Sequence, residues 1–180
     1  MDMRLPLLLS LLATALFACA SAPEPLTEGA GNTLPPAELV RAHLRAAEQG
    51  DWSTAEAHLA DDFAMQMKGM PFWVSIGRPH GLDMHKARKK AFPDFQFNEQ
   101  VVREEGNAVT IAVYLTGTHT GPLDYPIDEV PKMGPTGRTI DLPAEYFTYY
   151  VEKDRIRRIF GEIPEGHGPP ALKKQLGVED

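Results

Sequence analysis

His119 is the side chain best placed by the sequence to carry acid/base chemistry. It lies near the end of a stretch, 109–121 (VTIAVYLTGTHTG), that begins with apolar residues at every second position, as in a strand with one buried face. If the alternation continues through Gly117, His119 points to the same side as this apolar face. An imidazole titrates near neutral pH, which makes it a candidate general acid or base at the end of an apolar surface. The alternative is a strand end that opens into a loop with a hydrated histidine.

Two glutamates are candidate partners for His119. Glu145 lies on a long predicted strand, 138–151, and Glu162 lies on the last predicted strand, 155–162. A carboxylate within hydrogen-bond reach could fix the tautomer of the histidine or accept the proton itself. The chemistry would be proton abstraction next to a carbonyl, followed by aldol closure, isomerisation or dehydration. Each glutamate could instead be a solvated residue at a strand edge or in a loop.

The other histidines are not predicted to bind a metal. His80 and His85 are five residues apart and do not share a helix face at the spacing that a metal pair uses. His43 and His58 are expected at the surface or at the edge of an apolar stripe, with no metal-type residue nearby at a useful spacing. We therefore interpret these histidines as residues that do not bind a metal.

Apolar periodicity predicts the elements that would hold these side chains. Helices are expected over 35–49, 51–59, 81–92 and 171–176, and strands over 63–67, 95–104, 109–115, 138–151 and 155–162. Segregated helices and strands indicate an α+β fold, with three N-terminal helices packed on a strongly curved antiparallel sheet. Such a cone-shaped barrel would enclose a cavity. The aromatic residues Phe72 and Trp73, in the loop 68–81, could cover that cavity or anchor the loop on the core.

The composition excludes one class of partner. The 180 residues carry a net charge of −7, whereas a protein that binds nucleic acid needs a basic face. Hydrophobic residues make up 43% of the chain, which is enough for an ordinary core. The expected apolar surface near His119 instead predicts a hydrophobic small molecule as the partner.

The N-terminus has the pattern of an export signal. Arg4 precedes an apolar run, 5–17, that is too short to span a bilayer and is typical of a signal peptide. The segment 16–19 (LFAC) resembles the bacterial lipobox, which implies cleavage before Cys19 and lipidation of its sulfur; an ordinary secretory signal that ends near Ala20 or Ala22 is the alternative. The chain divides into a lipoprotein signal peptide (1–18), a flexible tether (19–34) and one domain (35–180). We expect a lipoprotein anchored in a membrane only by its lipid and facing the periplasm or the cell exterior.

Several short motifs are distributed over the whole predicted domain. They are 50–52 (GDW) with 57–63 (AHLADDF), 91–94 (AFPD), 115–122 (LTGTHTGP) with 135–138 (PTGR), and 174–177 (KQLG). Together they resemble the SnoaL-like polyketide cyclase (ester cyclase) family, within the nuclear-transport-factor-2-like superfamily. The resemblance implies an α+β cone with an apolar pocket, frequent homodimers, and no metal or organic cofactor.

The chain departs from this family where catalysis is expected. Family enzymes close a ring by an intramolecular aldol step, with a pocket aspartate that follows a tryptophan at a strand end. Here Phe160 takes the tryptophan's place and the aspartate position falls near Pro164, so that Glu162 or Glu165 would have to substitute. Three hypotheses follow: a cofactor-free acid/base enzyme acting on a hydrophobic carbonyl compound, a lipoprotein that only binds a small molecule, and a module that binds a partner protein through aromatic residues of 146–150.

Overall fold

The computed structural model describes residues 34–68, 74–125 and 132–178. The predicted signal peptide, Cys19, the tether up to Thr33, and the loop aromatics Phe72 and Trp73 lie outside these ranges. In the described part of the chain, no helix is long and apolar enough to cross a membrane.

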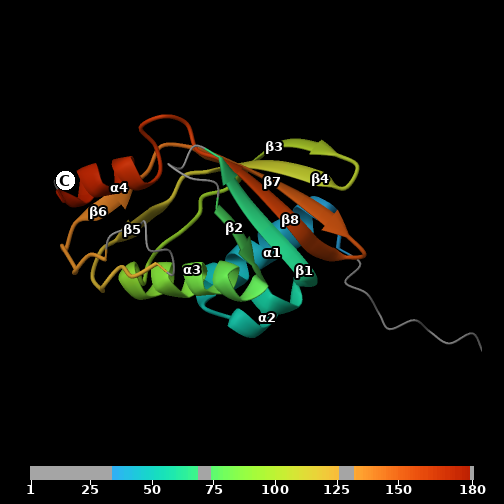
Figure 1. The fold of residues 1–180 in the computed structure, drawn as a ribbon, viewed down its shortest axis with the longest axis horizontal. Helices are drawn as coiled ribbons and strands as arrows, with labels where there is room; N and C mark the ends of the chain where they lie inside the picture. The colour runs from blue at the N-terminus through green and yellow to red at the C-terminus, as the bar shows by residue number, and fades with distance from the viewer. Residues whose placement is uncertain (1–33, 69–73, 126–131, 179–180) are drawn as a thin grey trace, which may run out of the picture.

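Three helices precede most of the sheet, as the periodicity predicts. They are α1 (Pro36–Gln49), α2 (Trp52–Ala57) and α3 (Arg78–Ala91). α1 ends at Gly50, whose φ of 75° is a conformation that glycine adopts without strain. α2 begins after Asp51, whose carboxylate accepts a hydrogen bond from the Thr54 backbone N–H at 3.1 Å. The three helices lie on one side of the sheet in Figure 1.

The strands form a six-stranded sheet and a separate two-stranded sheet. The larger sheet has the order β2-β1-β8-β7-β4-β3, and β5 pairs with β6. The strands are β1 (Leu59–Lys68), β2 (Val74–Gly77), β3 (Gln100–Glu105), β4 (Ala108–Val113), β5 (Thr116–Thr118), β6 (Thr139–Asp141), β7 (Glu145–Glu152) and β8 (Arg155–Glu162). The α+β class is thus confirmed, and β2 is a strand where the sequence predicts only loop.

Two expectations about the strands were wrong. The sheet is mixed rather than antiparallel, because β1 pairs with β8 in the parallel direction. These two strands come from opposite ends of the domain, and hairpin signals give no information about such a distant pairing. The long predicted strand 138–151 is divided into β6 and β7, which belong to different sheets. Pro143, which has no backbone N–H to donate, lies at the break.

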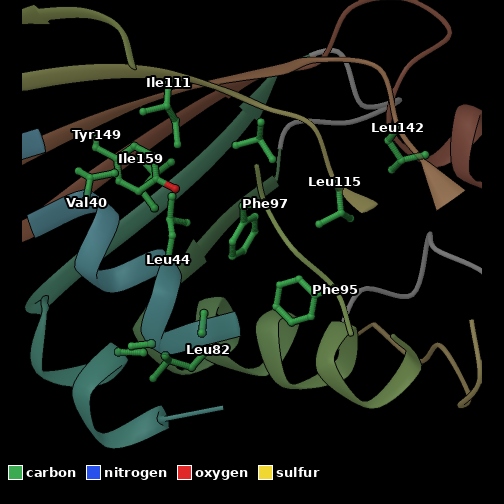
Figure 2. Close-up of a cluster of buried hydrophobic side chains, with 14 of the residues drawn as sticks. Val40, Leu44, Leu82, Phe95, Phe97, Ile111, Leu115, Leu142, Tyr149 and Ile159 are labelled. Atoms are coloured by element: carbon green, nitrogen blue, oxygen red, sulfur yellow. The ribbon is translucent and has the colours of Figure 1, made fainter. Parts of the chain in front are cut away.

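The core lies between α1 and the face of the sheet that the helices cover. Figure 2 shows Val40 and Leu44 of α1 beside Tyr149 of β7 and Ile159 of β8, all in one buried cluster. Tyr149 and Ile159 are direct neighbours in the register of the two strands. The cluster continues through Phe95 and Phe97, which follow α3 and whose rings meet edge to face with centroids 5.2 Å apart.

A fourth helix, α4 (Pro169–Leu176), lies beside β6 (Figure 1). The amide of Gln175 holds it there by two hydrogen bonds of 2.7 Å, one from the Asp141 backbone N–H and one to the Asp141 carbonyl. With α4 held in this position, its N-terminal turn lies at the end of the sheet where the cavity described below is found.

The C-terminal end of α3 is joined to the TGTHTG segment by a set of backbone hydrogen bonds. We call residues 91–95 and 116–121 together the α3–β5 joint. The Ala91 carbonyl accepts the N–H groups of both Thr120 and Gly121 at 3.0 Å. The Asp94 carboxylate accepts from the backbone N–H and the hydroxyl of Thr118, both at 2.7 Å. Two of the motifs quoted above, AFPD and LTGTHTGP, therefore contact each other directly.

The joint predicts a strong effect of a single methyl group at Gly121. A Cβ there would overlap the Lys90 carbonyl oxygen, which is backbone and cannot move aside without disturbing α3. We expect Gly121→Ala to lower the free energy of unfolding by about 1–3 kcal/mol, measured by urea or thermal unfolding. Gly134→Ala is the matched control, because no atom lies within 4 Å of the Cβ position at Gly134. Equal stability of the two variants would contradict the role given to the joint.

Candidate functional site

An apolar cavity of about 100 Å³ lies at the end of the sheet near α4. A second hollow of about 50 Å³ adjoins it and shares six of its wall residues, which are Met65, Met84, Arg88, Leu115, Glu145 and Phe147. The remaining wall of the larger cavity is formed by Met67, Phe92, Tyr125, Leu142, Ile163, Gly168, Pro169 and Leu172. A concave, mostly apolar site with few polar groups is typical of a small-molecule pocket.

The alternation of β7 places Glu145 in this cavity. Glu145, Phe147 and Tyr149 occupy every second position, and all three line the smaller hollow. Tyr146 and Tyr150 point to the opposite face and are 40% and 38% exposed. The sequence prediction that Glu145 lies on a strand was correct, although that strand begins at Glu145 itself.

Burial raises the pKa of the Glu145 carboxyl group above its ordinary value. Loss of hydration is the largest cause, and it is opposed by the charges of Arg88 and His167 and by a hydrogen bond from the Gly168 backbone N–H. A carboxyl group with a raised pKa keeps its proton to a higher pH than an ordinary glutamate and is a stronger base once ionised, which suits a group that both accepts and donates a proton. This property makes Glu145 the leading acid/base candidate of the site.

Arg88 supplies a positive charge on the α3 side of the same cavity. Its Nη1 group donates to Nδ1 of His85 at 3.1 Å, and its Nε atom is buried without a hydrogen-bond partner among the described residues. Arg88 and Glu145 both line the two hollows, yet none of the ion pairs of the described residues joins them. Arg88 is not recognisable as a site residue from the sequence, because it begins a basic run, 88–90, that is typical of a solvated helix end.

His119 is buried, but it is not part of the cavity wall. Its side chain has no exposed surface, and its ring stacks on Phe92 with centroids 4.9 Å apart. Nδ1 lies 3.1 Å from the Thr136 hydroxyl and accepts the Thr136 backbone N–H at 3.3 Å, which assigns the proton to Nε2. Nε2 has no hydrogen-bond partner among the described residues, and burial lowers the pKa of the imidazole. His119 thus stacks on Phe92, which lines the cavity, and its ring nitrogens do not bind a carboxylate in the described part of the chain.

Glu162 lies away from the cavity. Its carboxylate is 56% exposed and pairs with Lys68 at 3.3 Å. It borders a shallow hollow on the outer face of the sheet, together with Tyr146 and Phe160. The structure therefore brings Glu145 into the cavity and separates it from both His119 and Glu162.

His43 and His58 are more buried than the sequence indicates, with exposures of 1% and 9%. The His43 ring contacts the rings of His58 and His85, with centroids 6.2 Å and 5.8 Å away. Burial lowers the pKa of His43 to about 4, so this residue is neutral at physiological pH. The described residues contain no group of three or more side chains arranged to hold a metal ion.

The comparisons with known proteins agree with this architecture. The solved structures similar to this chain have the nuclear-transport-factor-2-like fold. IdmH from Streptomyces antibioticus, a candidate polyketide cyclase, aligns with a TM-score of 0.62 and 22% identity over 81% of this chain and 100% of its own. A candidate polyketide cyclase from Xanthomonas campestris aligns with a TM-score of 0.59 and 20% identity over 78% of this chain and 96% of its own. AclR from Streptomyces galilaeus, a candidate hydroxylase, aligns with a TM-score of 0.60 and 18% identity over 81% of this chain and 86% of its own.

The family is shown by the sequence comparison. The model of the SnoaL-like polyketide cyclase family matches residues 37–160, which is more than half of the chain. The chain therefore belongs to the SnoaL-like polyketide cyclase family. A search of curated proteins found no significant match.

The raised pKa of Glu145 predicts a pH-dependent difference in stability. The folded protein binds the Glu145 proton more tightly than the unfolded chain, so this contribution to stability is complete below the unfolded pKa, near 4.5, and is lost as the pH rises through the folded pKa. Relative to Glu145→Gln, the wild type should therefore lose stability as the pH rises from about 4.5 through the folded pKa.

Urea unfolding of both proteins across this range measures the difference. The exposed Glu162→Gln variant is the control and should follow the wild type. A constant difference between the wild type and Glu145→Gln would contradict the burial of the carboxyl group.

Proposed function

We propose that this protein binds a compact hydrophobic carbonyl compound in the apolar cavity and carries out cofactor-free acid/base chemistry on it with Glu145. The observation that supports the proposal most directly is a carboxyl group with a raised pKa in the wall of an otherwise apolar cavity. Of the three residues that the sequence suggests, we assign the proton transfer to Glu145. His119 would act only by holding Phe92 in the cavity wall.

The proposed chemistry needs only one residue to move a proton. The Glu145 carboxylate removes a proton from the carbon next to the substrate carbonyl, and the electron pair of the C–H bond moves to the carbonyl oxygen to give an enolate. The carboxylic acid then returns the proton. It protonates a different carbon in an isomerisation, or it protonates the alkoxide that forms when the enolate carbon attacks a second carbonyl in an aldol closure. Atoms and charge balance in both cases.

A second candidate function is ligand binding without catalysis. Two observations favour it. Phe160 lies on the outer face of β8 rather than in the cavity, and the family's aspartate position falls near Pro164, so the catalytic pair of the family is missing. Glu145 would then serve only to orient a ligand. The two candidates differ in whether a bound ketone loses its α-proton.

Exchange of that proton with solvent is the measurement that separates the two functions. In D₂O, NMR should show that the wild type accelerates loss of the methyl protons of acetophenone. Glu145→Gln should slow the enzymatic rate about 10²–10⁴-fold, which is the usual contribution of a general acid/base. His119→Gln and Glu162→Gln should stay within about tenfold of the wild type, because neither side chain lines the cavity.

An unchanged rate in Glu145→Gln, combined with a large loss in either other variant, would transfer the catalytic role to that residue. Binding of acetophenone with no exchange in any protein would favour the binding module.

We further propose that the protein is an exported lipoprotein, lipidated at Cys19 and facing the periplasm or the cell exterior. The support is the signal-like segment 1–18 and the LFAC pattern, with Cys19 as the only cysteine in the chain. Expressed in bacteria with labelled palmitate, the wild type should be labelled and sediment with membranes. The Cys19→Ser variant should lose both the label and the membrane association. If this variant keeps both, the proposal is contradicted. A homodimer, implied by the family resemblance, remains a prediction that light scattering can test.

A further inference from the structure

We propose that Arg88 is the receptor for an anionic group of the ligand, and that the cavity therefore takes compact apolar molecules that carry one carboxylate. This inference specifies the class of ligand for the apolar cavity. It rests on the proposed function, in which this cavity is the ligand-binding site. It does not depend on proton transfer by Glu145.

The hydrogen bonds of the guanidinium group are incompletely satisfied. An arginine side chain has five N–H donors in a planar fork and no acceptor. In this structure Nη1 donates to His85, whereas Nε is buried without a hydrogen-bond partner in the part of the chain that the structure describes. A buried donor that stays unpaired is costly, and a ligand oxygen would satisfy it.

Aromatic faces surround Arg88, and the Glu145 carboxyl group of the same cavity forms no ion pair with it among the described residues. The guanidinium carbon lies 5.5 Å from the ring centroid of Phe97, 5.9 Å from that of Tyr125 and 6.0 Å from that of Phe95. These distances are near the outer limit of about 6 Å for a cation–π contact, so the rings compensate the charge only weakly. None of the ion pairs of the described residues includes Arg88. The cavity wall therefore contains a positive charge that has no direct ion-pair partner among the described residues.

His85 fixes the orientation of the guanidinium group. Because arginine can only donate, the contact of 3.1 Å makes Nδ1 of His85 the acceptor and assigns the imidazole proton to Nε2. His85 also contacts the Phe97 ring edge to face, with centroids 5.6 Å apart. One nitrogen of the guanidinium is thus held toward α3, and a planar carboxylate is the group whose two oxygens match the remaining N–H donors.

Glu145 determines what the rest of the ligand can be. It shares both hollows with Arg88, so a carboxylate bound at Arg88 lies near a carboxyl group that must be protonated or displaced. The remaining walls are dominated by methionine, leucine and phenylalanine side chains. A small apolar body with a single carboxylate fits this arrangement, whereas a second anionic group would have no cation to pair with in the described wall.

Benzoate and benzamide are matched probes for the inference, because they have nearly the same shape and differ in charge. Titration calorimetry of the purified protein should show that the wild type binds benzoate at least tenfold more tightly than benzamide. Arg88→Gln should abolish this preference, and Arg88→Lys should keep part of it, since an ammonium group lacks the planar fork. Lys86→Gln, an exposed change on the same helix, should leave the preference intact.

Equal affinity of the wild type for the two probes, or a benzoate preference that survives in a folded Arg88→Gln protein, would overturn the inference. Circular dichroism establishes whether Arg88→Gln is folded. If it is not, the wild-type ratio and the reduced ratio expected in Arg88→Lys decide the question.

Glu145→Gln separates this inference from the proposed function. It should slow the exchange of acetophenone protons and keep the preference for benzoate, or increase it, because a neighbouring negative charge is removed. Unchanged exchange with an intact benzoate preference would refute only the proposed function. Slowed exchange without any benzoate preference would refute only the role of Arg88.

Discussion

The placement of α3 against the sheet depends on one backbone carbonyl. The Ala91 oxygen, at the last residue of the helix, accepts the N–H groups of Thr120 and Gly121 at 3.0 Å, and this joins the helix to the chain that leaves β5. Arg88 lies three residues earlier, about one helical turn away, and the smaller hollow is bounded by that turn. The joint thereby sets the distance at which the guanidinium group of α3 faces the carboxyl group of β7. A side chain at Gly117 would contact Phe92 and Phe95 closely, so the joint also requires small residues.

A second constraint is the cost of placing ionisable groups in an apolar cavity. Glu145, Arg88 and His85 all line hollows whose other walls are largely methionine, leucine and phenylalanine. Each group loses hydration, and the shift in the pKa of Glu145 and His85 toward the neutral form reflects that loss. A core built only for stability would replace such groups with apolar residues, because incompletely paired buried charges are destabilising. Their presence at one end of an otherwise ordinary core is the physical reason to regard this cavity as the functional site.

The segment that carries the most recognisable motif of the family is structural in this chain. The TGTHTG residues bind the AFPD turn through Asp94 and Ala91, and His119 is enclosed between Phe92 and Thr136. An imidazole that accepts a backbone N–H and has no access to solvent is suited to packing rather than to proton transfer. The resemblance therefore correctly indicated the family and the fold. The side chains that could act on a ligand, Glu145 and Arg88, come instead from β7 and α3.

The sequence by itself determined the parts of the protein that depend on local patterns. The periodicity of 35–49, the glycine at its end, the capping by Asp51 and the alternation through Val109 and Ile111 correctly predict α1, α2 and β4, because burial of one face imposes a fixed spacing. The predicted strand 138–151 likewise placed Glu145 on a strand. The tertiary structure alone decided the parallel pairing of β1 with β8, the pairing of β6 and β7 in different sheets, the burial of His43 and the convergence of Arg88 and Glu145 on one cavity. These features join residues that are far apart in the chain, and the free energy that selects them comes from packing between elements, which no local pattern records.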